Sequence, residues 1–333
     1  MGTVLAYPEE YFAVEQMNDH HFHYGYWIRT MADLALRDPE WTSDPQWGGM
    51  TQLLIKDIAT AERGRADFPF LRPFDVYEGH SWASGIALGD LGNNQESSSE
   101  AINAWSALIL WAEIRGDKAL RDLGIYLYTT EIEAIRHYWF DVHNIVFAPE
   151  YKNKEVSMLF GGAYKHNTWW TDEPRQIKGI NLLPISSSST YLGLDPEHTR
   201  RSLATLPEDT RIYESRGKRA NPTDMWQDLF AKYMALANPH NGLAMWDRWG
   251  AVELGDTRTH ALHFMLSLEK MGVPDFSVSA NHALYSVFKR SDGLRTYLAY
   301  NAGSQAKTVT FSDGQVLQVP PRSLAQASKK VSP

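Results

Sequence analysis

Residues 18–26 read Asn-Asp-His-His-Phe-His-Tyr-Gly-Tyr, and residues 93–100 read Asn-Asn-Gln-Glu-Ser-Ser-Ser-Glu. The first stretch opens a helical pattern, since Asn18 is a good N-cap and apolar residues then recur at helical spacing as far as Asp38. The second stretch leads into residues 99–115, where a buried helix face is indicated by Ala101, Trp105, Leu108 and Ala112. Both stretches therefore bring carboxylates to predicted helix starts.

The remainder of the chain predicts a mainly α fold with a small C-terminal antiparallel β region. Short β-rich runs begin after Val273 and are separated by turn signals such as Ser291-Asp292-Gly293. We expect a helical domain over 1–272 and a small β-rich region over 273–333. Further helices are predicted at about 47–62, 117–139, 195–205, 223–237 and 256–271.

Composition narrows the class of protein. A chain of 333 residues that is 43% hydrophobic can fill one large catalytic domain with a small appendage. The net charge of -8 offers no basic footprint, so we expect no nucleic-acid partner. The absence of an eighteen-residue apolar run and of a signal-peptide pattern at the start predicts a soluble chain without a membrane partner. Zero cysteines exclude thiol nucleophiles and disulfides but leave the compartment open.

Three carboxylates, Asp19, Glu96 and Glu100, lie among aromatic, histidine and amide side chains, a mixture typical of acid/base attack on a sugar linkage. If the second helix begins near Asn94, Glu96 and Glu100 stack on one face, and burial would raise one pKa. His23 follows Asp19 by one helical turn and could orient it. The alternatives are an acidic capping turn for the glutamates and a first-turn aspartate whose pKa the helix dipole would lower.

Two loops carry further candidates. Asp75, Glu78, His80 and Trp82 fall in a Gly- and Pro-interrupted loop, where such groups are often ligand contacts, although a well-hydrogen-bonded structural loop is the alternative. Residues 164–170 end in Trp169 and Trp170, which could form a sugar platform or plug a core.

Metal and cofactor chemistry is disfavoured. His20, His21 and His23 invite a metal site, but no His-Glu-x-x-His pattern accompanies them and neighbouring histidines point in different directions on a helix. The chain contains no Gly-x-Ser-x-Gly, no Gly-x-Gly-x-x-Gly and no phosphate-binding loop. We therefore predict neither a metal nor a cofactor.

At three motifs the chain resembles glycoside hydrolase family 81, the endo-β-1,3-glucanases. The motifs are Asn18 to Tyr26, Tyr77-Glu-Gly-His-Ser-Trp-Ala-Ser-Gly85 and Gly92-Asn-Asn-Gln-Glu-Ser-Ser-Ser-Glu100, in the family's order. The resemblance continues more loosely to about Gly272. It implies an (α/α)6 toroid with an open cleft, β-1,3-glucan as the substrate, hydrolysis with inversion, and secretion from the cell.

Carried onto this sequence, the resemblance implies Asp19 as general acid and Glu96 as the general base that activates water, with Glu100 and His23 as close supporters. Inverting enzymes hold the two carboxyl groups about 6.5–9.5 Å apart, which residues on two different helices can provide. The resemblance further implies substrate contacts from Tyr24, Asp75, His80 and Trp82. We also expect substrate contacts from Tyr26, Glu78, Asn94, Trp169 and Trp170.

The chain departs from the family pattern at its start, because only seventeen residues precede Asn18 where the family has a β-sandwich domain, a linking domain and further helices. Seven or eight helices are predicted, fewer than the twelve of a complete toroid. We therefore expect an incomplete toroid whose uncovered apolar helix faces promote self-association. Two other functions remain open: a non-catalytic glucan-binding remnant, and another helical-toroid carbohydrate enzyme such as a polysaccharide lyase or phosphorylase.

Overall fold

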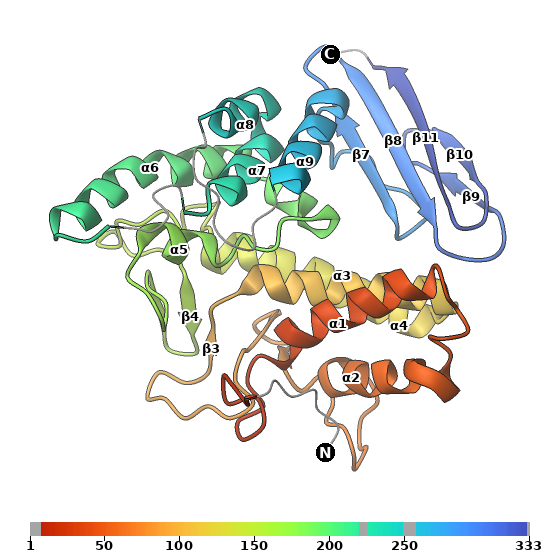
Figure 1. Cartoon of the computed structure of the whole chain (residues 1–333), viewed down its shortest axis with the longest axis horizontal. Helices are drawn as coiled ribbons and strands as arrows, with labels where there is room; N and C mark the ends of the chain where they lie inside the picture. Colours follow the sequence, from red (N-terminus) through yellow and green to blue (C-terminus); the bar gives the residue numbers. More distant parts are fainter. Residues whose placement is uncertain (1–7, 220–224, 249–257, 332–333) are drawn as a thin grey trace. The chain divides into compact units, whose positions relative to one another are not determined.

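A computed structural model describes residues 8–219, 225–248 and 258–331 (Figure 1). The chain divides into two compact units, one formed by Met1–Trp139 and Val156–Lys165 and the other by Phe140–Glu155 and His166–Pro333. None of the helices in the described ranges has the length and apolarity needed to cross a bilayer.

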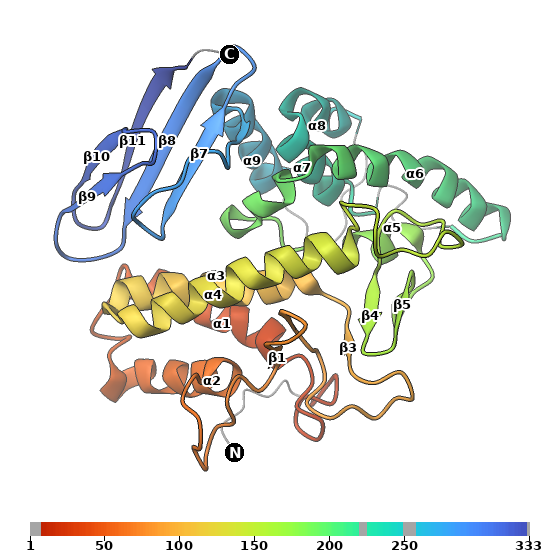
Figure 2. The same cartoon turned by 180° about the vertical axis from the view of Figure 1, so that it is seen from behind.

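The first unit is built on helices that pack lengthwise. Figures 1 and 2 both show α1, α3 and α4 side by side. Gly25 permits the close approach of α1 to α3, since a Cβ there would lie 2.8 Å from the Ala104 Cα. The side chains of Ile28, Trp105 and Leu108 are fully buried between the helices. The helices are α1 (His20–Ala35), α2 (Gly49–Ala59), α3 (Ser98–Arg115) and α4 (Lys118–Ala134), with π-helical turns at Asp44–Gly48 and Ile135–Trp139.

Very short strands fix the loops of this unit. β1 (Phe74–Asp75) pairs antiparallel with β2 (His80–Ser81), and β3 (Asn94–Gln95), β4 (Met158–Phe160) and β5 (Ala163–Lys165) form a three-stranded antiparallel sheet in that order. Strands of two or three residues are too short to show a periodic pattern, which is why the sequence did not predict them.

The second unit contains the remaining helices and the C-terminal strands. Its helices are α5 (Pro174–Gly179), a 3-10 helix (Ser187–Gly193), α6 (Pro196–Ser215), α7 (Gln227–Ala237), α8 (Pro239–Trp246) and α9 (Arg258–Met271). Its strands are β6 (Val273–Pro274), β7 (Tyr285–Lys289), β8 (Leu294–Asn301), β9 (Lys307–Thr310), β10 (Val316–Val319) and β11 (Ser323–Lys330). They form two antiparallel sheets, ordered β11-β8-β7-β6 and β10-β9.

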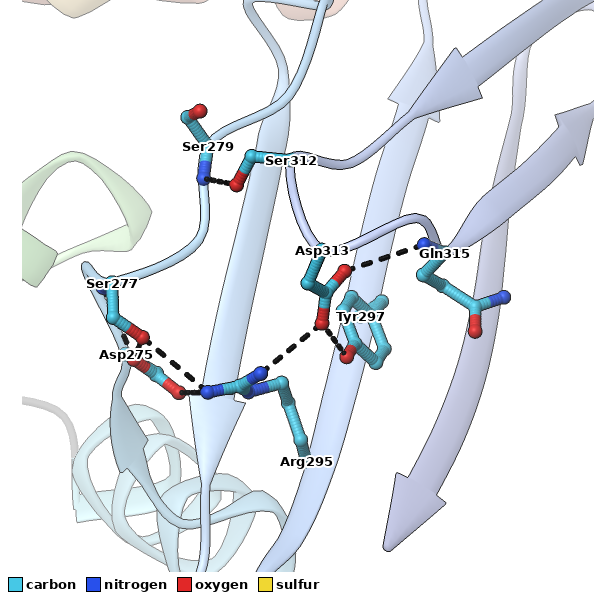
Figure 3. Close-up of polar contacts among 8 residues, drawn as sticks. All are labelled: Asp275, Ser277, Ser279, Arg295, Tyr297, Ser312, Asp313 and Gln315. Carbon is cyan, nitrogen blue, oxygen red and sulfur yellow. Dashed lines mark hydrogen bonds and ion pairs between the residues drawn. The ribbon is translucent and has the colours of Figure 1, made fainter. Parts of the chain in front are cut away.

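A polar cluster ties the β region together (Figure 3). Arg295 on β8 donates to Asp275, which follows β6, at 2.9 Å, and to Asp313 in the β9–β10 turn at 3.1 Å. The hydroxyl of Tyr297 also donates to Asp313. Because the Arg295 side chain is only 12% exposed, both ion pairs are partly shielded from water. Next to this cluster, Tyr297 and Phe311 pack in the apolar core of the sheets.

The structure confirms a mostly helical chain with small antiparallel sheets, and it corrects several boundaries. The helix predicted over 99–115 is α3, which begins at Ser98 and not near Asn94, whereas α5, α8 and β11 were not predicted. The expected helix starts at Thr223 and Asp256 lie outside the described residues. The domain boundary at residue 272 stays a prediction, because the two compact units divide the chain at other positions.

Candidate active site

Asp19 is held by its backbone at the start of α1. It is the N-cap residue, with φ 60° and ψ 16°, and its side chain caps nothing. The left-handed conformation is one that aspartate tolerates better than most residues, and such strain is common at functional sites. The Asp19 amide donates to the carbonyl of Ala83 at 2.9 Å, which joins the helix start to the loop after β2.

A second backbone bond brings Glu96 to the same place. The Ala83 amide donates to the Asn94 carbonyl at 2.7 Å, so the chain around Asp19, Ala83 and Asn94 forms one short ladder. Glu96 follows Asn94 by two residues. The Gln95 side chain closes a tight turn around Glu96 by accepting from the Ser97 amide at 3.2 Å.

Glu96 and Glu100 do not share a helical face. The sequence placed them on one face only if the helix began near Asn94. Because α3 begins at Ser98, Glu96 lies in the preceding loop and Glu100 in the first helical turn. That condition is not met, because strand β3 and the Gln95 turn occupy the residues before Ser98. Within the described residues, the Glu96 Oε2 atom is buried and has no hydrogen-bond partner.

Glu100 is fixed by two hydroxyl donors. Tyr26 donates to its Oε1 at 2.8 Å, and Ser97 donates to its Oε2 at 2.6 Å. The first turn of a helix also favours negative charge. Glu100 is therefore oriented from both sides, whereas no hydrogen bond is recorded for the Asp19 carboxyl group within the described part of the chain.

Burial raises the pKa of all three carboxyl groups, and neighbouring negative charge raises those of Asp19 and Glu96 further. The pKa of Asp19 rises to about 7, first because of burial and then because of the charges of Glu96 and Glu100. Burial and the Glu100 charge raise the pKa of Glu96 to about 7. Burial also raises the pKa of Glu100, although its bonds to Ser97 and Tyr26 act in the opposite direction. Groups tuned in this way can exchange protons near neutral pH.

His23 is adjacent to the site but does not tune Asp19. Burial and the neighbouring His20 lower its pKa, so its ring is neutral at neutral pH. The ring contacts that of Tyr11, with centroids 5.6 Å apart. The causes of the raised Asp19 pKa are burial and the two glutamates. A supporting role for His23 stays a prediction.

Of the predicted substrate contacts, two are core residues. Tyr24 is 1% exposed and His80 is 0% exposed, so neither side chain is accessible to a polysaccharide, and these two predictions were wrong. Tyr24 lies on the buried face of α1, and His80 is enclosed by the rings of Trp82 and Trp139. Each motif contains both buried and exposed residues, and the sequence alone does not show which residues are buried.

Other predicted contacts are accessible in the same unit. Tyr26 is exposed, whereas Glu78, Trp82 and Asn94 are half-buried. Glu78 accepts from the Tyr138 hydroxyl at 3.0 Å. Their role in binding substrate stays a prediction.

Asp75 organises its own loop. One of its carboxyl oxygens accepts from the amides of Tyr77 and Glu78 at 2.9 and 3.2 Å, and the other accepts from the Trp82 indole at 3.3 Å. These donors lower the pKa of Asp75 despite its partial burial. This loop is therefore well hydrogen-bonded, which was the structural alternative for Asp75.

The histidines next to Asp19 have structural partners. His20 contacts Asp57 at 2.7 Å and the Ala13 carbonyl at 2.7 Å, and Asp57 also pairs with Arg72. His21 stacks on Trp105 at a centroid distance of 5.9 Å. Among the residues that the structure describes, no group of three His, Cys, Asp or Glu residues could hold a metal ion.

Trp169 and Trp170 belong to the second unit. Both side chains are exposed, which rules out the alternative that they plug a core. Trp170 lies 6.3 Å from Trp226, measured between ring centroids. Their use as a sugar platform stays a prediction.

Two exposed aromatic residues were missed in the sequence. Tyr11 is 60% exposed beside His23, and Tyr77 is 90% exposed at the tip of the Asp75 loop. Tyr77 lies inside one of the three motifs, so the motif itself was the signal. Tyr11 precedes the first motif, and its ring contact with His23 connects it to the site.

Comparisons with known proteins identify the family of this chain. Residues 5–261 match the model of the glycosyl hydrolase family 81 C-terminal domain. The chain belongs to glycoside hydrolase family 81. The resemblance seen in the three motifs is thereby confirmed.

Two curated relatives in this family are named glucan endo-1,3-beta-D-glucosidase. The protein from Acetivibrio thermocellus is 49% identical over 324 residues, which is 97% of this chain and 41% of the relative. The protein from Thermobifida fusca is 38% identical over 326 residues, which is 97% of this chain and 42% of the relative. The chain thus spans less than half the length of these two relatives.

A solved structure is also similar. It is a family 81 glycoside hydrolase from Clostridium thermocellum, determined as a glutamate-to-alanine mutant, with a TM-score of 0.88 and 48% sequence identity. The match covers 98% of this chain and 44% of that one. The family 81 fold therefore extends over nearly the whole chain.

Proposed function

We propose that this chain carries the catalytic residues of an endo-β-1,3-glucanase that hydrolyses laminarin-type glucans with inversion. The observation that carries the proposal is the trio Asp19, Glu96 and Glu100: burial raises the pKa of all three, and the charge of neighbouring carboxylates raises those of Asp19 and Glu96 further. Both curated relatives are named as glucan endo-1,3-beta-D-glucosidases, which supports the choice of β-1,3-glucan as the substrate.

Asp19 acts as the general acid. Its carboxyl group donates a proton to the glycosidic oxygen as the bond from that oxygen to C1 breaks. A pKa of about 7 keeps a large share of Asp19 protonated at neutral pH, whereas an ordinary aspartate would be ionised. The charges of Glu96 and Glu100 are part of the reason that the proton is retained.

Glu96 acts as the general base. It removes a proton from a water molecule while the water oxygen bonds to C1 from the opposite face of the sugar, which inverts the anomeric configuration. Its buried Oε2 has no hydrogen-bond partner among the described residues and is therefore able to accept that proton. Glu100, held by Tyr26 and Ser97, supplies a fixed negative charge that affects both partners.

Substrate binding is assigned to exposed and half-buried side chains of the same unit. Tyr26, Trp82 and Tyr11 offer aromatic faces suited to sugar rings. We further propose that these helices belong to an (α/α)6 toroid and that the reaction takes place outside the cell, since a glucan polymer is too large to cross a membrane. Self-association stays a prediction.

Product analysis on laminarin tests this function. Hydrolysis predicts new reducing ends without unsaturated sugars and without dependence on phosphate, whereas a lyase or a phosphorylase would give one of those signatures. Glu96→Gln should abolish sugar release while glucan binding is retained. A wild-type chain that binds glucan but releases no sugar would support the non-catalytic alternative.

A further inference from the structure

Glu131 of α4 is a buried carboxyl group outside the proposed catalytic trio. Its side chain is 0% exposed. Its Oε1 atom accepts from the amide and the hydroxyl of Ser81 at 3.1 and 2.7 Å, and its Oε2 atom accepts from the Trp105 indole at 2.6 Å. None of these recorded partners is a cation. A buried carboxyl group held only by neutral donors lowers the stability of the fold. We therefore expect a functional reason for a glutamate at this position.

Ser81 connects Glu131 to the segment that carries Glu96. The buried Gln95 amide donates to the Ser81 carbonyl at 3.0 Å and to the Ser81 hydroxyl at 2.8 Å. The other end of the same Gln95 side chain accepts from the Ser97 amide. The residues on both sides of Glu96 are therefore fixed through one side chain that rests on Ser81.

Ser81 also leads to Asp19 along the backbone. Ala83, two residues after Ser81, accepts from the Asp19 amide at 2.9 Å and donates to the Asn94 carbonyl at 2.7 Å. The third contact of Glu131, Trp105, stacks on His21 at 5.9 Å, two residues after Asp19. The side chain of Glu131 thus lies where the supports of both segments meet.

We propose that Glu131 is a positioning residue that sets the separation between the carboxyl groups of Asp19 and Glu96. The inference rests on the proposed function. Only a carboxylate offers acceptors on both sides, which the Ser81 amide, the Ser81 hydroxyl and the Trp105 indole require. A glutamine of the same shape would place an NH2 group against one of these donors.

The first test compares Ser81→Ala, Glu131→Gln and the control Glu113→Gln. Glu113 is another buried carboxylate of the same unit; it is paired with Arg121 and lies near the C-terminal end of α3, which begins at Ser98. Because a misplacement of about 1 Å can cost about 100-fold in rate, we expect kcat on laminarin to fall about 10- to 100-fold for Ser81→Ala and Glu131→Gln with KM nearly unchanged. Glu113→Gln should lower Tm without lowering kcat.

A leaving-group series separates positioning from simple loss of stability. If Asp19 is displaced, aryl β-1,3-oligoglucosides with poor leaving groups should lose more activity than those with good leaving groups, because the latter need little acid assistance. A loss of kcat that is equal for all leaving groups and follows Tm would overturn the inference. If the wild-type chain releases no sugar, the proposed function fails instead.

A structure of Ser81→Ala tests the inference without any activity. We expect the separation of the Asp19 and Glu96 carboxyl groups to change by more than about 0.5 Å, the tolerance within which catalytic groups must be held. An unchanged separation in a folded Ser81→Ala protein would overturn the positioning role, whatever the activity of the wild type.

Discussion

Carboxylates in two regions of the molecule titrate in opposite directions. At the proposed active site, Asp19 and Glu96 face further carboxylates, and their pKa values rise to about 7. In the β region, Asp275 and Asp313 flank Arg295 (Figure 3), and hydrogen bonds and the cation lower their pKa values. The same residue types thus become proton donors where burial and neighbouring carboxylates dominate, and structural anions where hydrogen bonds and a cation outweigh burial.

The largest effect is expected when the proposed general acid is removed. Asp19→Asn should lower kcat on laminarin by about 10²- to 10⁴-fold, because an amide cannot protonate the leaving oxygen. The matched change in the β region, Asp313→Asn, should leave kcat unchanged and lower Tm. Reducing-end assays measure kcat and thermal melts measure Tm for both variants. If Asp19→Asn keeps its activity, the raised pKa of Asp19 does not mark a catalytic acid, and the contrast between the two regions has no functional meaning.

The next prediction tests whether the charge of Glu100 raises the pKa values of its two neighbours. Glu100→Gln removes the negative charge that raises the pKa values of Asp19 and Glu96, so both should fall. Asp19 would then lose its proton at lower pH, and the optimum of the pH–rate profile should move to lower pH, with at least about a 10-fold loss at pH 7. An optimum that stays in place or rises would show that the three groups do not interact.

The contrast was only partly visible in the sequence. The motifs identified Asp19, Glu96 and Glu100, and helical periodicity located α1 and α3, because these signals depend on nearby residues. The bonds from Asp19 to Ala83 and from Ala83 to Asn94 join positions far apart in the chain through strands too short to show a pattern.

Burial and network partners were equally inaccessible. Tyr24 and His80 share their motifs with exposed residues, yet the fold encloses both. Glu131 occurs in an ordinary helical stretch. The positioning role proposed for it depends on hydrogen bonds from Ser81 and Trp105, which other elements bring to its carboxyl group. Such contacts are decided by packing between elements, which a single sequence does not specify.

A third prediction concerns stability in the β region. Arg295→Met would leave Asp275 and Asp313 without their cation, and losing one partner of a partly buried pair should cost about 2–4 kcal/mol. The control is Asp292→Asn, whose partners Arg290 and Lys330 both have exposed side chains, and we expect a change below about 1 kcal/mol. Urea unfolding curves measure the loss of unfolding free energy in each variant. Equal losses in Arg295→Met and Asp292→Asn would argue against shielding of the Arg295 cluster from water.

The smallest predicted effect is a pH dependence of stability. A group whose pKa is raised on folding contributes stability that is complete below its unfolded pKa, near 4.5 for Glu96, and is lost as the pH rises through about 7. The Tm of Glu96→Gln should therefore exceed that of the wild type at pH 8 but not at pH 4. Each kcal/mol of added unfolding free energy should raise Tm by roughly 2–4 °C.

Asp275 and Asp313 give the opposite sign. Their lowered pKa values contribute stability above the unfolded pKa of 3.8, and this contribution is lost as the pH falls through the lower pKa of the folded state. Asp313→Asn should accordingly destabilise the protein at pH 7 and approach the wild type in acid. Equal pH profiles for Glu96→Gln and Asp313→Asn would contradict the opposite titration of the two regions.

The configuration of the first product tests the central claim most directly. Proton NMR of laminarin hydrolysis should show the α-anomer at new reducing ends first, with the β-anomer growing in only by mutarotation, because Glu96 delivers water to the face opposite the bond that Asp19 protonates. First appearance of the β-anomer would mean a covalent intermediate with carboxyl groups about 5–5.5 Å apart, and would contradict the assignment of Asp19 as acid and Glu96 as base.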